Sequence, residues 1–357
     1  MIGRILALSV RGRWLVAFLT LIVIGFGAWQ ITKLPIDAVP DVTNRQVQIS
    51  TFAPTLGPVD IEKQVTFPVE TALAGIPGLQ MTRSFSRNGF SQVTAVFEDS
   101  TDIYFARQQV TERIAQAKDS LPAGVQPNLA PLSTGLGEIF FYSVAFRHPD
   151  GKGGAEHVDG KPGWQTDGSY LTPEGERLTT ELAKAAYLRT VQDWIIRPQM
   201  RNVKGVAGVD SNGGYVKQYL VEPNLNALAT YGLSITELAD ALEKANLSAG
   251  SNYVRRAGES FLVRADARLR SISEIEEAVV ATRGGTPVRV KDVGQVVIGG
   301  AVRTGSGSRM GSEAVISTVL MLVGENSRIV ANSAAERLTE INKALPPDVF
   351  AEPVYNR

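Results

Sequence analysis

The 357-residue chain contains no cysteine and only two histidines, which excludes several kinds of chemistry at once. Without cysteine there are no disulfides, no thiolate nucleophile and no cysteine-ligated zinc or iron–sulfur site. Two histidines offer no Ser-His-Asp or Cys-His set, and the Gly-rich fragments 135–137 and 284–285 lack the spacing of a phosphate cradle. The sequence therefore predicts a protein that is not an enzyme and has no cofactor.

The chain also lacks a net charge, because it has 36 basic and 36 acidic residues. No long run of one sign occurs, and we expect no nucleic-acid partner. Apolar residues make up 44% of the chain and charged residues 20%, which is typical of a globular rather than a disordered protein. The length is sufficient for two or three domains.

One long apolar run is present, and it lies close to the N-terminus. No charged residue occurs between Arg13 and Lys33, and a helix of that length crosses roughly 30 Å of hydrocarbon. Trp14 and Trp29 lie near its ends, and arginines but no acidic residues precede it. We therefore predict a transmembrane helix over 14–32 with a cytoplasmic N-terminus. A cleaved signal peptide is the alternative, but no A-x-A motif follows the run.

One supersecondary pattern recurs along the remaining chain. In the first copy, the apolar spacing predicts a helix over 58–74, a strand over 92–97 and a second helix that Asp102 caps. The second copy opens near Leu188 and closes near Val349. Strands that alternate with helices of this length predict split β-α-β units, each a sheet with helices on one face. The expected fold class is α+β.

About ninety residues interrupt the second copy, over approximately 215–298, and predict an inserted α+β subdomain. Within it, Ser234-Ile235-Thr236-Glu237 is a capping box at the head of a helix. The stretch 246–265 predicts a long hairpin with a polar tip around 255–259. The hairpin is a candidate arm for gripping a neighbouring subunit, and a solvated hairpin is the alternative.

The segment 148–169 shows no helix or strand period and is predicted to be an exposed loop. Its first dozen residues, 148–159, carry His148 and His157 together with three carboxylates, a ligand set suited to zinc, cobalt or nickel. The spacing matches no fixed motif, so a solvated loop without metal is the alternative. His148 and His157 are nevertheless candidate metal ligands.

Two carboxylates elsewhere are candidates for contact with a cation. Glu138 lies between the Gly-rich run 133–137 and the apolar strand 139–142, where a carboxylate is partly shielded. Asp210, near the end of the strand after the second copy's turn, is a weaker candidate. An ordinary strand-end or turn carboxylate is the alternative for both. The few methionines show no helical pairing, which argues against a soft copper(I) or silver(I) site.

Five runs resemble the heavy-metal efflux branch of the resistance-nodulation-division (RND) permeases, the CzcA and CusA type. They are LPIDAVPDV at 34–42, TRSFSR at 82–87, TDIYFAR at 101–107, STGLGE at 133–138 and DWIIRPQ at 193–199. The resemblance implies a secondary active transporter of the bacterial inner (plasma) membrane, a homotrimer that exchanges protons for divalent cations such as zinc, cobalt, cadmium or nickel. It also implies a periplasmic adaptor and an outer-membrane channel as partners, and contact with membrane lipid.

The same resemblance implies a division of the chain. The expected parts are an N-terminus and transmembrane helix over 1–33, a ferredoxin-like porter subdomain over 34–134, a second porter subdomain over 135–214 and 299–357, and a docking subdomain over 215–298. The chain is expected to stop before a second transmembrane helix, with the proton-relay carboxylates in the part beyond it.

For the site, the resemblance matches Glu138 to the Glu of the family's STGLGE run at the mouth of the porter cleft. Two alternatives remain open at this point. One is an RND permease for organic compounds, whose pocket would be aromatic and apolar. The other is a single-span periplasmic binding or assembly module that does not transport.

Overall fold

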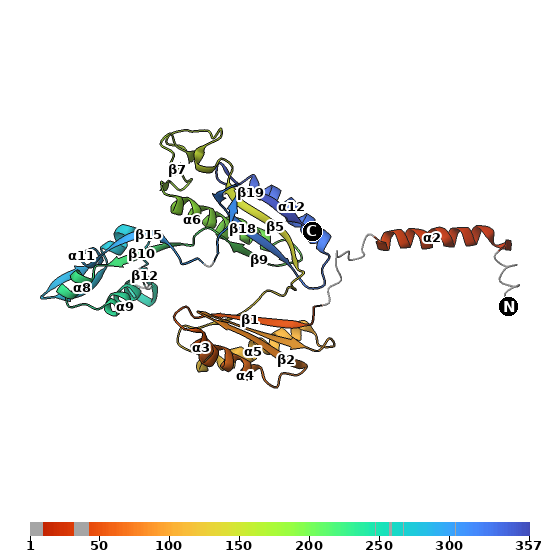
Figure 1. Cartoon of the computed structure of the whole chain (residues 1–357), viewed down its shortest axis with the longest axis horizontal. Coiled ribbons are helices and arrows are strands. Elements are labelled where there is room, and N and C mark those ends of the chain that lie inside the picture. The colour runs from red at the N-terminus through yellow and green to blue at the C-terminus, as the bar shows by residue number, and fades with distance from the viewer. Residues whose placement is uncertain (1–9, 32–42, 247, 257–258, 267, 304) are drawn as a thin grey trace.

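The computed structural model describes residues 10–31, 43–246, 248–256, 259–266, 268–303 and 305–357. A helix near the N-terminus stands apart from two sheet-and-helix units and an inserted third unit (Figure 1). The family-like run at 34–42 lies outside the described residues, as do residues 257–258 in the expected tip of the hairpin. The mixture of helices and sheets confirms the α+β class.

Helix α2 (Arg13–Ile31) confirms the predicted apolar helix near the N-terminus. It has 19 residues and a mean hydropathy of 2.0, and none of its residues is buried against the rest of the chain. By length and composition it is able to cross a membrane.

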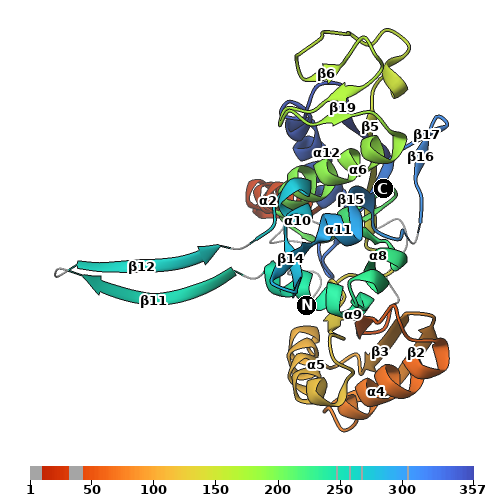
Figure 2. The same ribbon diagram turned by 90° about the vertical axis from the view of Figure 1, so that its left-hand side faces the viewer.

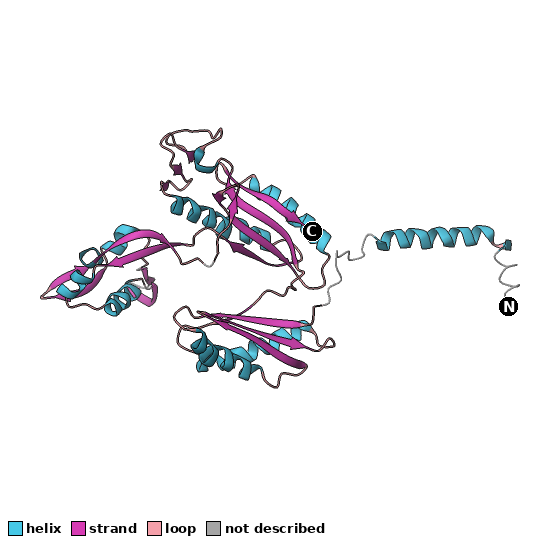
Figure 3. Cartoon of the chain, viewed as in Figure 1, coloured by secondary structure: helices cyan, strands magenta, loops and turns pink. Residues whose placement is uncertain are grey.

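The first unit is a four-stranded antiparallel sheet covered by helices. Its elements are β1 (Gln46–Phe52), α3 (Pro58–Ile61), a π-helical turn (Glu62–Thr66), α4 (Phe67–Leu73), β2 (Leu79–Arg87), β3 (Phe90–Phe97), α5 (Ile103–Ala117), a 3₁₀ turn (Lys118–Ser120) and β4 (Pro127–Leu129). The strand order is β2-β3-β1-β4, and each neighbouring pair is antiparallel. The helices lie together on one face of the sheet (Figure 3), where Ile49, Leu73, Phe97 and Val110 form the core.

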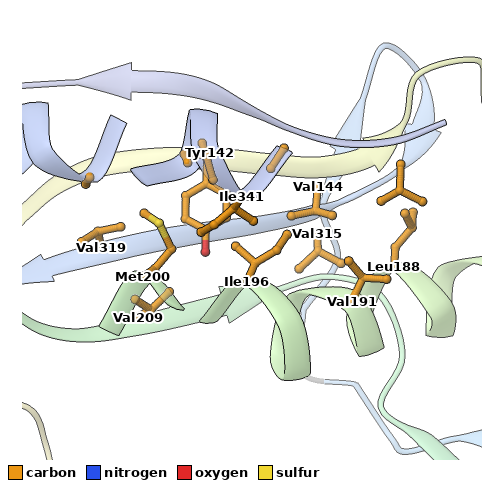
Figure 4. Packing of buried hydrophobic residues seen from close by; sticks show 14 of the residues in the cluster. Tyr142, Val144, Leu188, Val191, Ile196, Met200, Val209, Val315, Val319 and Ile341 are labelled. Atoms are coloured by element: carbon orange, nitrogen blue, oxygen red, sulfur yellow. The ribbon is translucent and has the colours of Figure 1, made fainter. Parts of the chain in front are cut away.

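The second unit repeats this topology. Its elements are β5 (Glu138–Phe146), α6 (Glu181–Val191), a π-helical turn (Gln192–Ile196), α7 (Arg197–Arg201), β9 (Val206–Asn212), β18 (Val315–Met321), α12 (Ser327–Asn342) and β19 (Val349–Asn356). The order β19-β5-β18-β9 matches the first sheet strand for strand. In its core, Tyr142 and Val315 on the strands face Leu188 and Ile196 on the helices (Figure 4).

The first helix of this repeat, α6, begins at Glu181, so the opening predicted near Leu188 falls seven residues too late. The reason is that the first helix has no clear polar face. Residues 184–188 of α6 are all buried, including the charged Lys184. A helix that is buried almost all round loses the amphipathic period by which it is recognised.

Both units widen their first helix into a π-helical turn directly before a proline. The N–H of Phe67 donates to the carbonyl of Glu62, and that of Arg197 to the carbonyl of Gln192, five residues back in each case. Pro68 follows the first turn and Pro198 follows the second. A proline has no N–H and collides with the carbonyl four residues before it, and a wider turn relieves that collision.

The inserted unit leaves the second sheet after β9 and returns to β18. Its elements are β10 (Lys217–Pro223), α8 (Leu225–Thr230), α9 (Ile235–Ala245), β11 (Ser248–Arg256), β12 (Glu259–Asp266), α10 (Ile272–Glu276), β13 (Val279–Arg283), β14 (Thr286–Arg289), α11 (Val290–Val293) and β15 (Gly294–Gly300). Strands β10 and β15 pair antiparallel and so bring the two ends of the insert together. The predicted capping box is confirmed at Ser234 and Glu237.

The predicted hairpin is also confirmed. Strands β11 and β12 pair antiparallel with each other, with one register shift between Gly250 and Tyr253. The pair projects away from the other elements as a two-stranded arm (Figure 2). A second, short hairpin, β16 (Ser308–Arg309) and β17 (Ser312–Glu313), follows the insert.

The prediction of an exposed loop over 148–169 was wrong for part of that segment. After a 3₁₀ turn (Pro149–Gly151), the chain forms a small sheet of β6 (Gly163–Trp164), β7 (Tyr170–Leu171) and β8 (Arg177–Leu178). Trp164 and Tyr170 are buried, with ring centroids 5.1 and 4.8 Å from that of Phe146. Contacts with residues that are distant in the sequence hold these strands in place. Such contacts produce no periodic pattern of apolar residues within the segment itself.

Candidate functional site

Glu138 and Asp210 lie on the same face of the second sheet. Strand β18 separates them, since Glu138 is opposite its Leu320 and Asp210 is opposite its Thr318. Cross-strand neighbours and residues two apart share a face, and this face is opposite to that of the buried Val319. Both carboxylates are therefore exposed on the side of the sheet that the helices do not cover.

The two carboxylates are not brought together. Their strands are two strand spacings apart, roughly 10 Å, and they are offset by two residues along β18. Among the residues that the structure describes, no group of three or more His, Asp or Glu side chains is arranged to hold a metal ion. This face offers separate carboxylate contacts rather than a closed coordination shell.

The turn before Glu138 has no room for a side chain at Gly137. The N–H of Gly137 donates to the carbonyl of Thr134 at 2.9 Å, and the N–H of Met321 donates to the carbonyl of Gly137 at 2.8 Å. A Cβ on Gly137 would lie 3.0 Å from the Thr134 oxygen and 3.2 Å from the Met321 oxygen. Gly137 thus allows the turn to pack closely against β18. This packing sets the position of Glu138, the first residue of β5.

A cavity of about 400 Å³ lies where the two units meet, next to this turn. Ser133 and Thr134 line it from the turn, Asn44 lines it from the first unit, and Glu325 lines it from the segment after β18. Glu325 was not predicted. The internal repeat does not point to it, because Glu325 directly precedes the N-cap of α12, and Thr101 has the corresponding position before α5.

His148 ties the segment after β5 to the far end of the second unit. Its Nδ1 lies 2.6 Å from Oδ1 of Asp348, and its backbone N–H donates to Oδ2 of the same carboxylate at 3.1 Å. The indole N–H of Trp164 donates to that Oδ2 as well, at 2.7 Å. Asp348 therefore anchors two parts of the segment at one point.

His157 uses both ring nitrogens within its own segment. Nδ1 lies 2.9 Å from the carbonyl oxygen of Gln165, and Nε2 lies 2.9 Å from that of Gly151. Both contacts are hydrogen bonds only when the ring is doubly protonated, and they raise the pKa of His157 above its ordinary value. In this arrangement His157 has no lone pair directed at a metal, and among the described residues no group of three or more candidate ligands joins it to His148.

Comparisons with known proteins give one consistent result. The sequence profile of the AcrB/AcrD/AcrF family matches residues 5–357. The chain is 59% identical to the nickel-cobalt-cadmium resistance protein NccA of Alcaligenes xylosoxydans xylosoxydans and 57% identical to the nickel and cobalt resistance protein CnrA of Cupriavidus metallidurans. Each match covers 100% of this chain and 33% of the relative.

Solved structures agree with the sequence matches. An X-ray structure of a heavy metal efflux pump superposes with a TM-score of 0.79 and 28% sequence identity. The superposition covers 99% of this chain and 32% of the pump. The chain therefore spans about a third of the length of the proteins that it matches.

Proposed function

This chain belongs to the AcrB/AcrD/AcrF family, and from that premise we propose that it forms part of a proton-driven efflux permease for divalent heavy-metal cations, above all nickel, cobalt and cadmium. The observation that carries the proposal is the 59% and 57% identity, over the whole chain, to proteins named for resistance to these metals. Zinc belongs to the same borderline class of cation and is a further expected substrate.

The proposed arrangement places α2 across the inner membrane, with the N-terminus in the cytoplasm and the remaining chain in the periplasm. The two repeated units are then porter subdomains of ferredoxin-like topology, over 34–134 and over 135–214 with 299–357. The insert over 215–298 is the docking subdomain. The pairing of β10 with β15 supports this last assignment, because it makes the insert a separate lobe on a two-stranded stem.

The proposed assembly is a homotrimer that works with a periplasmic adaptor and an outer-membrane channel. The arm of β11 and β12 supports contact with a neighbouring subunit, because it extends beyond the lobe that carries it (Figure 2). A projecting two-stranded arm has little core of its own and gains stability by packing against a partner.

In the proposed mechanism, Glu138 is a transient contact for the cation. Its side chain is exposed and follows the turn that lines the cavity between the two units, and Ser133, Thr134 and Glu325 add oxygen atoms to the lining of that cavity. Isolated carboxylates bind a borderline cation more weakly than a closed set of four ligands. Weak contacts suit a pathway in which relative motion of the units, driven by protons, passes the cation on.

A chimera tests this assignment. We would replace the first third of NccA with this chain, express the chimera in metal-sensitive cells, and compare the chimera with its Glu138→Gln form. Loss of the carboxylate charge should lower nickel and cobalt tolerance, whereas Glu112→Gln, an exposed carboxylate on α5 of the first unit, should not. Unchanged tolerance in Glu138→Gln, at equal amounts of membrane protein, would remove Glu138 from the pathway.

A further inference from the structure

A second cavity, of about 260 Å³, lies away from the proposed cation path. It is bounded by α6, by the π-helical turn that follows α6, and by the turn between β7 and β8. We call it the Trp194 cavity. Its apolar walls come from Leu178, Ala183, Val191 and Trp194, and Trp194 as a residue is 79% exposed to solvent. An indole that lines an apolar cavity supplies the kind of aromatic wall found in small-molecule sites.

The cavity also contains a polar group without a partner. Tyr187 lines the cavity from α6 and is only 9% exposed. Its hydroxyl oxygen is buried and has no hydrogen-bond partner in the described part of the chain. A buried hydroxyl without a partner is unfavourable, and a bound ligand with an N–H group would supply the missing hydrogen bond.

The electrostatics of the cavity favour a positive ligand. Glu174 and Glu176 both line it and, after burial, are the causes that raise the pKa of Tyr187, so the field at the phenol is negative. Glu176 is neutralised by Lys217, whose Nζ lies 2.6 Å from its carboxylate. Glu174 has no ion pair with any residue that the structure describes. One negative charge therefore remains beside an aromatic wall.

The chain already pairs a cation with an aromatic ring nearby. Nζ of Lys184 lies 5.0 Å from the centroid of the Trp164 ring. Trp194 offers a second indole, which is mostly exposed to solvent and lines the same cavity as Glu174. Among the aromatic side chains, tryptophan attracts an ammonium group over its ring face most strongly.

We propose that the Trp194 cavity binds small organic ammonium ions that carry an apolar body, at a site separate from the proposed metal path. The apolar body occupies the space between Leu178 and Val191. The ammonium group lies between the Trp194 ring and the Glu174 carboxylate, and one of its N–H groups donates to the Tyr187 hydroxyl oxygen. This proposal uses none of the residues assigned to metal transport, so its test does not depend on the proposed transport function.

Fluorine NMR of the full chain in detergent, labelled with 5-fluorotryptophan, tests the proposal. The Trp194 resonance is assigned from Trp194→Phe, and the chain is titrated with phenethylammonium and, separately, with the neutral 2-phenylethanol. We expect a saturable shift of the Trp194 resonance with the ammonium ion, and affinity about threefold to tenfold lower for the alcohol. No saturable shift, or equal affinity for the two compounds, would overturn the proposal.

Two variants and a matched control complete the test. Glu174→Gln and Tyr187→Phe should each weaken phenethylammonium binding, the first by about tenfold, whereas Glu112→Gln should leave it unchanged. The resonances of the other tryptophans show whether each variant is folded. Equal binding by Glu174→Gln and Glu112→Gln, with both proteins folded, would mean that the carboxylate has no part in the site.

Discussion

Gly137 determines how closely the turn before Glu138 can approach β18. Replacing it with alanine would place a Cβ 2.1 Å from Oγ of Ser133 and close to two carbonyl oxygens. The hydroxyl can rotate away, but the carbonyls belong to the turn and to β18. We expect Gly137→Ala to destabilise the chain by about 1–3 kcal/mol.

Thermal unfolding of the full chain, followed by circular dichroism, measures this effect. Gly135→Ala is the matched control, because a Cβ at Gly135 meets nothing within 4 Å. Ser133→Ala combined with Gly137→Ala should recover part of the loss, since it removes the nearest atom. Equal melting temperatures for the Gly137 and Gly135 variants would contradict the close packing described for this turn.

At the same scale, His157 should titrate at an unusually high pH for a histidine. The carbonyl of Gln165 and then that of Gly151 are the main causes of the raised pKa of His157, because both accept hydrogen bonds from the protonated ring. A raised pKa in the folded state means that the stabilisation is complete below the ordinary value of about 6.5. It is lost as the pH rises through the raised value.

Proton NMR of the imidazole rings checks this prediction, and the two histidines are separated by a His148→Gln variant. His157 should titrate above about 6.5, and amide exchange around Gly151 and Gln165 should speed up once the ring becomes neutral. Titration of His157 at or below the ordinary value would show that the ring does not donate to both carbonyls.

At the scale of elements, the caps are the clearest case of local sequence determining structure. Oδ1 of Asp102 accepts hydrogen bonds from the N–H groups of Tyr104 and Phe105, both at 2.9 Å. Asp102→Ala should therefore destabilise the start of α5 by about 1 kcal/mol. Amide hydrogen exchange of the first turn of α5 should quicken about fivefold, whereas Asp99→Ala, three residues earlier and exposed, should have no effect. Unchanged protection of Tyr104 and Phe105 would rule out the cap.

Elements of this kind could be predicted because their signals are local. The helix that Asp102 caps, the capping box at Ser234 and the paired hairpin strands β11 and β12 all follow from residues close together in the sequence. The small sheet of β6, β7 and β8 could not be predicted, because distant contacts hold it. The Trp164 indole reaches Asp348, and the Tyr170 hydroxyl donates to the carbonyl of Pro347.

The candidate site, too, could be predicted from the sequence only in part. The sequence singled out Glu138 and Asp210, and the structure places them on one exposed face, but their separation depends on strand order, which no local pattern encodes. His148 and His157 were chosen for their ligand chemistry. Their hydrogen bonds to Asp348 and to two backbone carbonyls became visible only in three dimensions.

At the scale of the whole molecule, the chain contains two units of the same topology, and the segments that connect their strands and helices differ in length. In the first unit, strands β2 and β3 are joined by a turn at 88–89, whereas the corresponding β9 and β18 are separated by the inserted unit. The link from the first strand to the first helix is 53–57 in one unit and 147–180 in the other. The common topology supplies two similar bodies, and the extensions supply what is specific to the second unit.

The family resemblance inferred from five short runs is confirmed by the family profile over 5–357 and by the match to a heavy metal efflux pump. The runs at 133–138 and 193–199 now have structural roles, as the tight turn before β5 and as the π-helical turn before Pro198.

Nickel tolerance of cells that carry the NccA chimera, without any further substitution, tests the central claim most directly. If this chain forms the corresponding third of a heavy-metal efflux permease, the chimera should restore growth in nickel to a level near that of NccA itself. A chimera that reaches the membrane in the same amount as NccA, yet leaves the cells as sensitive as those without it, would contradict the account.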